Sequence, residues 1–228
     1  MKVGDKVELV PDDEYVSKKS RVLEIKTRLD GACRADNLAI CLDLGWAGSM
    51  NGKEISKLAS QLARVHGANK KSPKPAKVYF SSFAEESSLY AECVRKHIGF
   101  ESYQIEMDHR PHHELFEKDE IVILSPDAEQ PLEQVELGKV YVIGGIVDET
   151  RKHRLTLDQA ATNQIAARRL PIREHLELED QSKRGRRGVC TILAANQVFE
   201  ILLKQFETGC WKEALKVGVP PRKGFKIE

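Results

Sequence analysis

The chain has 228 residues, of which 41% are hydrophobic and 31% are charged, so it holds enough apolar material for a core and is not a disordered chain. Lysine and arginine number 36 against 35 aspartates and glutamates, so the net charge of +1 favours no class of partner and only the distribution of charge is informative. No apolar run approaches the roughly 18 residues that a membrane helix needs, and no secretory leader is visible, so we expect no membrane partner.

Hydrophobic patterning predicts alternating strands and helices from residue 38 onward. Short runs of consecutive apolar residues indicate strands, and apolar residues three and four positions apart indicate helices. In chain order, the patterns predict a short basic helix around residues 22–29, a strand over 38–42, a helix over 55–67, a strand over 78–80, a helix over 89–99, strands over 103–107, 121–124 and 140–143, a helix over 156–168, an extended piece over 170–172, a helix over 192–206 and a last helix from Trp211.

The predicted central strands are apolar throughout, which is typical of strands covered by helices on both faces. The sequence therefore predicts an α/β fold with a mostly parallel sheet flanked by helices. In such sheets ligands bind outside the carboxyl ends of the strands. Three segments fall there: residues 124–127 (Leu-Ser-Pro-Asp), residues 144–148 (Gly-Gly-Ile-Val-Asp) and the loop before Ile192.

Two features of the second segment have open alternatives. Gly144 and Gly145 permit a backbone to approach a ligand closely, although spacing alone favours an ordinary tight turn. Asp148 is placed either to accept a proton or hold a ligand, or to cap the next segment, and the pattern does not decide between these roles. Neither a dinucleotide-binding glycine motif nor a phosphate-binding P-loop is present.

Three histidines, His109, His112 and His113, lie close together among acidic residues. Because Pro111 breaks any helical spacing between them, the pattern favours a solvated loop over a metal site, and we expect no metal. The sequence also lacks the motifs of serine hydrolases and zinc proteases.

Basic residues gather in three stretches that we expect to lie around the ligand edge of the sheet. No acid occurs between Ile55 and Ala84 or between Gln181 and Phe199. Solvated loops are the alternative, but three such stretches favour a nucleic-acid partner. The candidate contacts are Arg64, Lys70, Lys71, Lys74, Arg151, Lys152, Arg154, Lys183, Arg184, Arg186 and Arg187.

The segments 141–148 (YVIGGIVD), 167–172 (ARRLPI) and 193–202 (LAANQVFEIL) occur in this order, followed by 211–214 (WKEA) and 220–224 (PPRKG). They resemble the signature of the tRNA position-9 purine N1-methyltransferase family of the SPOUT superfamily. Residues 42–43 and 124–127 match more loosely, so the resemblance covers roughly residues 36–228. Among vertebrate branches, the sequence is most similar to the second, non-mitochondrial paralogue.

The resemblance implies a SPOUT-type fold whose C-terminal part forms a deep trefoil knot, with knot segments at 124–127, 144–148, 168–172 and 191–196. It divides the chain into a methyltransferase domain, 36–228, and a basic segment, 1–35, as the remnant of a tRNA-binding extension. It also implies S-adenosyl-methionine as the cofactor, tRNA as the partner, a monomer, and a cytoplasmic or nuclear location, with a mitochondrial one left open. The implied cofactor contacts are Leu124, Ser125, Gly144, Gly145, Arg169, Leu170, Ile172, Leu193, Ala195 and Asn196.

The implied reaction is methylation of N1 of the purine at position 9 of tRNA. N1 of guanine carries a proton that it must lose, and Asp148 is the candidate base. N1 of adenine needs no deprotonation, and the sequence leaves the purine open. The alternative functions are a tRNA-binding module that assists tRNA processing with weak or no catalysis, and a SPOUT enzyme acting on a different RNA.

Overall fold

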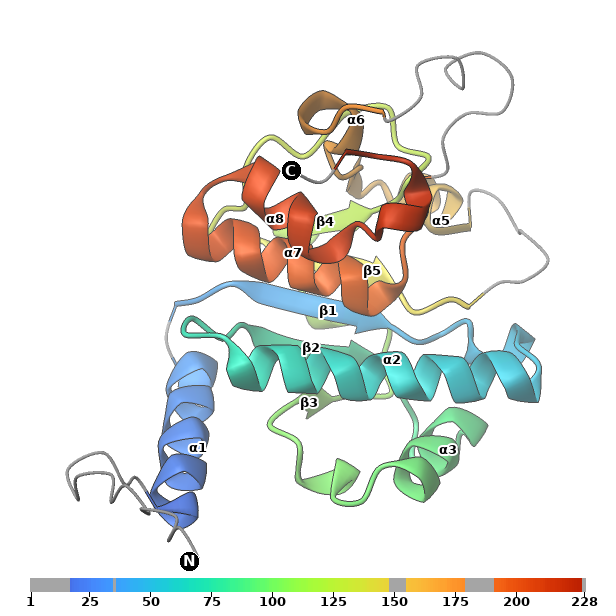
Figure 1. Cartoon of the computed structure of the whole chain (residues 1–228). Coiled ribbons are helices and arrows are strands. Elements are labelled where there is room, and N and C mark those ends of the chain that lie inside the picture. Colours follow the sequence, from blue (N-terminus) through green and yellow to red (C-terminus); the bar gives the residue numbers. More distant parts are fainter. Residues whose placement is uncertain (1–16, 35, 148–154, 179–190, 227–228) are drawn as a thin grey trace, which may run out of the picture.

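The computed structural model describes residues 17–34, 36–147, 155–178 and 191–226. Within these ranges, six strands form one parallel sheet in the order β3-β2-β1-β5-β4-β6 (Figure 1), which confirms the predicted α/β fold. The strands are β1 (Ala39–Asp43), β2 (Lys77–Ser81), β3 (Glu106–Met107), β4 (Ile121–Leu124), β5 (Val140–Gly144) and β6 (Ala166–Arg168). The helices are α1 (Lys18–Arg34), α2 (Gly52–Lys71), α3 (Ser88–Lys96), α4 (His112–Leu115), α5 (Leu155–Asn163), α6 (Ile172–His175), α7 (Ala195–Thr208) and α8 (Trp211–Gly218).

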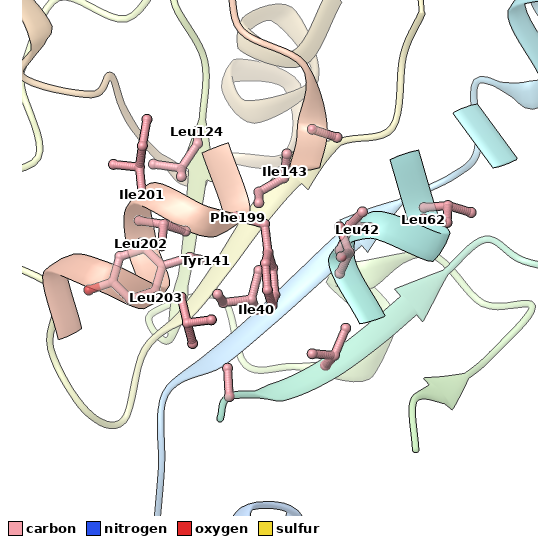
Figure 2. Close-up of a cluster of buried hydrophobic side chains, with 14 of the residues drawn as sticks. Ile40, Leu42, Leu62, Leu124, Tyr141, Ile143, Phe199, Ile201, Leu202 and Leu203 are labelled. Atoms are coloured by element: carbon pink, nitrogen blue, oxygen red, sulfur yellow. The ribbon is translucent and has the colours of Figure 1, made fainter. Parts of the chain in front are cut away.

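Alternate residues of the central strands point to opposite faces of the sheet, and both faces are apolar. On one face, Ile40 and Tyr141 belong to a core that includes residues of α2, α7 and α8. Phe199 of α7 is fully buried there and lies over β1 and β5 (Figure 2). On the other face, Cys41 and Val142 pack in a smaller core with Ala160 of α5. The sheet is therefore covered on both sides, as its uninterrupted apolar strands require.

Helix α2 runs four residues beyond Gly67, where the sequence predicted its end. It begins with a capping box, in which the Asn51 side chain accepts from two backbone amides and Glu54 accepts from the Asn51 amide. At its C-terminal end, the buried Asn69 side chain accepts from the Ala76 amide and donates to the Ala76 carbonyl. These hydrogen bonds stabilise the last turn of α2, so Gly67 alone does not end the helix.

The predicted helix over 156–168 is wrong from residue 164 onward. Helix α5 ends at Asn163, Gln164 adopts a positive φ of 56°, and residues 166–168 pair with β4 as a sixth strand. Their Ala-Ala-Arg sequence favours a helix locally, so strand pairing outweighs local preference here. The expected strand over 103–107 is likewise only Glu106–Met107. The expected extended piece over 170–172 leads into α6, and the helix expected from residue 192 begins at Ala195.

Helix α1, which lies within the predicted basic N-terminal segment, packs on α2 and β2. Leu29 and Ala32 are buried, whereas Val22 and Leu23 are exposed. The Arg28 guanidinium donates to the Lys70 carbonyl oxygen at 2.8 Å, so basic residues of α1 and α2 lie side by side.

The packing of α8 on α7 predicts that Gly218→Ala destabilises the fold. A Cβ at this position would lie 2.6 Å from the Gln197 carbonyl oxygen and would collide with the Ile201 side chain. Overpacking of this kind costs about 1–3 kcal/mol, measurable by urea unfolding. The neighbouring exposed Val217 is the matched control, because Val217→Ala should leave the unfolding midpoint almost unchanged. Equal stability of both variants would contradict the described packing.

Candidate active site

A cavity of about 380 Å³ lies where β4, β5 and β6 end. This is the carboxyl edge of the sheet, where ligands were expected. Its walls come from residues 124–129 after β4, residues 143, 144 and 146 at the end of β5, and residues 155 and 156 of α5. The wall is completed by segments around α6 and α7, namely residues 169, 170, 172 and 173 and residues 191–193, 195 and 198.

The segments that the family resemblance singled out therefore meet around this cavity. All predicted cofactor contacts except Gly145 and Asn196 line it: Leu124, Ser125, Gly144, Arg169, Leu170, Ile172, Leu193 and Ala195. They come together because β4, β5 and β6 are neighbours in the sheet and α7 begins beside them. Backbone bonds fix the geometry, since the Ser125 amide donates to the Arg168 carbonyl and the Ala195 amide donates to the Gln61 side chain.

The two predicted cofactor contacts that do not line the cavity, Gly145 and Asn196, are surrounded by other parts of the protein. The Gly145 amide donates to the Asp43 carbonyl oxygen at 2.8 Å, and a Cβ here would lie 2.9 Å from that oxygen and collide with Leu44. Asn196 is buried in the first turn of α7, where its Nδ2 donates to Glu200. Its Oδ1 has no hydrogen-bond partner among the described residues. The turn and the helix that carry these two residues therefore adjoin the cavity, whereas Gly145 and Asn196 themselves face the protein interior.

Gly144 and Gly145 are required by close packing between chain segments. A Cβ on Gly144 would lie 2.6 Å from Thr156 Cγ2, so α5 approaches the end of β5 as closely as a glycine permits. Neither glycine has a positive φ, which means that the need is for space and not for a left-handed turn.

The cavity combines an apolar interior with charged groups. Leu124, Ile143 and Ile172 supply buried apolar surface. Arg169 lies in the wall and forms two hydrogen bonds with Glu174, at 3.0 and 2.6 Å. This pairing raises the pKa of Arg169 and lowers the pKa of Glu174, so both groups keep their charges over a wide pH range.

A polar cluster, which we call the Asp43 network, lies next to the cavity and consists of the buried Asp43 and His112 and the half-buried Ser82 and Gln159. Asp43 Oδ1 accepts from the Gly45 amide at 3.2 Å and from Ser82 Oγ at 3.1 Å. Asp43 Oδ2 accepts from Gln159 Nε2 at 3.2 Å and lies 3.5 Å from His112 Nδ1. Burial alone raises the pKa of Asp43, but His112 and the hydrogen bonds outweigh it, so the pKa is lowered.

Little in the amino-acid pattern indicated this network. Asp43 was placed at a strand end, but neither Gln159 nor Ser82 belongs to a recognisable motif. Ser82 stands out only in the structure, where it adopts a positive φ of 54°. The prediction of a solvated histidine loop is wrong for His112, which is 0% exposed, because α4 turns it inward toward Asp43. In the described part of the chain, no group of three or more His, Cys, Asp or Glu side chains is arranged to hold a metal.

The candidate nucleic-acid contacts on α2 do not lie at the ligand edge, which corrects the expectation from the sequence. Arg64, Lys70 and Lys71 belong to the second half of α2, and Lys74 follows in the turn before β2. Helix α2 runs back along β1 (Figure 1), so its C-terminal end lies where the strands begin, away from the cavity. Outside the described residues lie Asp148, Arg151, Lys152, Arg154, Lys183, Arg184, Arg186 and Arg187.

Residues 6–224 match the family described as tRNA (guanine(9)-N(1))-methyltransferase TRM10/TRM10A. The chain belongs to this family. This TRM10 membership confirms the family that the sequence motifs indicated. No helix in the described ranges is long and apolar enough to cross a membrane.

Relatives from several vertebrates carry the name tRNA methyltransferase 10 homolog B. The protein from Bos taurus is 40% identical over 188 residues, covering 82% of this chain and 58% of that protein. The protein from Danio rerio is 39% identical over 215 residues, covering 94% of this chain and 68% of that protein. The chain thus spans little more than half of the bovine relative, and the predicted similarity to the second vertebrate paralogue is confirmed.

A solved TRM10 structure shares the architecture. The crystal structure of full-length spTrm10 in complex with SAH superposes with a TM-score of 0.70 at 29% identity. The match covers 80% of this chain and 95% of that chain, so the sheet and its flanking helices correspond over most of the described domain.

Proposed function

We propose that this TRM10 chain transfers a methyl group from S-adenosyl-methionine to N1 of the purine at position 9 of a tRNA. The observation that carries the proposal is the cavity at the carboxyl edge of the sheet, where the segments expected to hold the cofactor converge. The family name and the SAH complex of spTrm10 support the same cofactor and substrate. The name also favours guanine as the methylated base.

The residues around the cavity fit the proposed cofactor. A volume of about 380 Å³ falls in the range of small-molecule sites, which are mostly apolar with a few placed polar groups. Leu124, Ile143 and Ile172 offer an apolar surface for the adenine ring. The exposed Arg173 supplies a positive charge in the wall for the carboxylate of the methionine part. S-adenosyl-methionine supplies an electrophilic methyl group on a sulfonium.

The protein contributes in two ways: it aligns the nucleophile with the methyl group, and it accepts a proton. A displacement gains much of its rate from holding the nucleophile in line with the methyl group, and the cavity walls provide the fixed side of that arrangement. Asp148 follows four residues after Gly144 of the cavity wall and is our candidate to accept the N1 proton of guanine. We also propose that the converging segments form the trefoil knot and that the enzyme acts as a monomer.

A methyl-transfer assay with purified tRNA transcripts tests the proposal. We expect incorporation of one labelled methyl group, mapped by mass spectrometry to N1 of position 9, with guanine and adenine transcripts compared in parallel. Binding of both SAH and tRNA without methyl transfer would instead support a tRNA-binding module. Methylation at another site, or of another RNA, would overturn the position-9 assignment.

The basic end of α2 predicts a salt-dependent contribution to tRNA binding. Replacing Lys70, Lys71 and Lys74 by Ala should reduce the slope of log affinity against log salt by roughly one unit for each phosphate that these lysines neutralise in the wild type. The exposed Lys118, which lies between two acids, is the control, since Lys118→Ala should leave the slope unchanged. An unaltered slope in the triple variant would show that this end of α2 does not bind tRNA.

A further inference from the structure

We propose that Gln159 and Asp43 are positioning residues that hold the α5 wall of the cavity in place for the cofactor. This inference rests on the proposed function, because it assumes that S-adenosyl-methionine occupies the cavity. It assigns a role to a hydrogen bond that joins α5 to the end of β1 and that no sequence motif marks.

The first turn of α5 forms part of the cavity wall. Leu155 and Thr156 line the cavity, and Gln159 follows Thr156 by three residues, so both side chains lie on the same side of the helix. The Gln159 amide donates to Asp43 Oδ2 at 3.2 Å. A movement of Gln159 therefore displaces the first turn of α5, whose residues Leu155 and Thr156 line the cavity.

Apolar packing alone anchors α5 weakly. Among the described residues of this helix, Ala160 is the one that is fully buried, and Leu155 and Leu157 are half-buried, so α5 buries less apolar surface than a helix with several fully buried side chains. The bond from Gln159 to a carboxylate is charge-assisted, which makes it stronger than a bond between neutral groups. The position of the helix on the sheet thus depends on a polar contact more than is usual for a surface helix.

The acceptor of this bond is itself rigid. Asp43 ends β1, directly paired with Gly144 of β5, and its carboxylate is fixed by the Gly45 amide and Ser82 Oγ. The Asp43 main-chain oxygen also accepts from the Gly145 amide. Gln159 is therefore tied to the same strand ends that form the opposite part of the cavity.

The close approach of α5 to β5 makes the wall sensitive to small shifts. A Cβ on Gly144 would lie 2.6 Å from Thr156 Cγ2, so Thr156 already touches the backbone that lines the cavity. Movement of α5 toward β5 is blocked by this contact, and movement away from it is opposed by the Gln159–Asp43 bond. Together the two contacts set the width of the cavity on this side.

The direct test is the affinity for SAH of Gln159→Leu, measured by calorimetry well below the unfolding temperature. We expect the dissociation constant to rise about three- to tenfold, because the binding-competent position of α5 becomes less populated. Thr162→Val is the matched control, since it removes a hydrogen bond of the same helix, from Thr162 Oγ1 to the Asp158 carbonyl, on its exposed side. The control should bind SAH like the wild type.

A second variant separates positioning from general destabilisation. In Gln159→Glu, the introduced carboxyl faces Asp43 and can donate to it only when protonated, and the neighbouring carboxylate raises its pKa. The affinity for SAH should therefore recover as the pH falls from 8 to 6. His112 lies 3.5 Å from Asp43, and the Cys41 thiol also interacts with Asp43. Both groups are present in every variant, so the wild type measured over the same pH range is the reference for the introduced carboxyl.

Hydrogen exchange completes the test. In Gln159→Leu, amides of α5 should exchange faster while those of α7 keep their protection, and saturating SAH should restore protection in α5. Wild-type affinity in Gln159→Leu, or faster exchange throughout the domain, would overturn the positioning role. Failure of the wild type to bind SAH would instead refute the proposed function.

Discussion

Asp148→Asn should slow methyl transfer to a guanine at position 9 by about 10²–10⁴-fold, the usual contribution of a positioned general base. Asn keeps the shape of the side chain but cannot accept the N1 proton. Single-turnover rates with saturating cofactor and tRNA measure this step directly, because they exclude product release. The affinity for SAH should stay close to that of the wild type.

The decisive comparison is between the two purines. N1 of adenine already offers a lone pair, so an adenine transcript should lose much less rate than a guanine transcript in the same variant. Equal losses on both bases would contradict proton abstraction by Asp148 and leave it a role in orienting the purine or the cofactor. Asp127→Asn, which changes a carboxylate that lines the cavity, controls for the loss of a negative charge near the site.

The sheet could be predicted from the sequence where burial alone determines the pattern. Strands β4 and β5 are covered on both faces, so they show as uninterrupted apolar runs. Strand β6 has only three residues, and its Ala-Ala-Arg sequence prefers a helix. Pairing with β4, a contact between residues more than 40 positions apart, determines its conformation and leaves no local signal.

The cavity and its surroundings also divide into parts with a local sequence signal and parts that depend on contacts between distant residues. Eight residues of the cavity wall could be named in advance because they belong to contiguous motifs that resemble those of a known family. The Asp43 network could not, since Asp43 and Gln159 are 116 residues apart and each is unremarkable in its own segment. The position of Lys70 and Lys71 was also missed, because the direction in which α2 returns along the sheet decides which edge they reach.

Asp43→Ala should lower the free energy of unfolding by about 3–5 kcal/mol at neutral pH, the usual cost of removing one partner from a buried charged cluster. The change leaves Ser82, Gln159 and the Gly45 amide without their acceptor, and His112 without its neighbouring charge, in a largely buried site. Urea unfolding at pH 7 measures the loss. Asp108→Ala is the control, because that carboxylate pairs with Arg110 in a more exposed position and should matter far less.

The pH dependence of this difference follows from the lowered pKa of Asp43 in the folded protein. In the unfolded chain an aspartate titrates near pH 3.9, so the stabilisation that comes from ionised Asp43 is complete above that value. It is lost as the pH falls through the lower folded-state pKa, because the unfolded chain then binds its proton first. The part of the gap between wild type and Asp43→Ala that comes from ionised Asp43 should therefore be complete above about pH 5 and narrow below about pH 4. A gap that widens as the pH falls below about 5 would mean that burial dominates and that folding raises the pKa of Asp43.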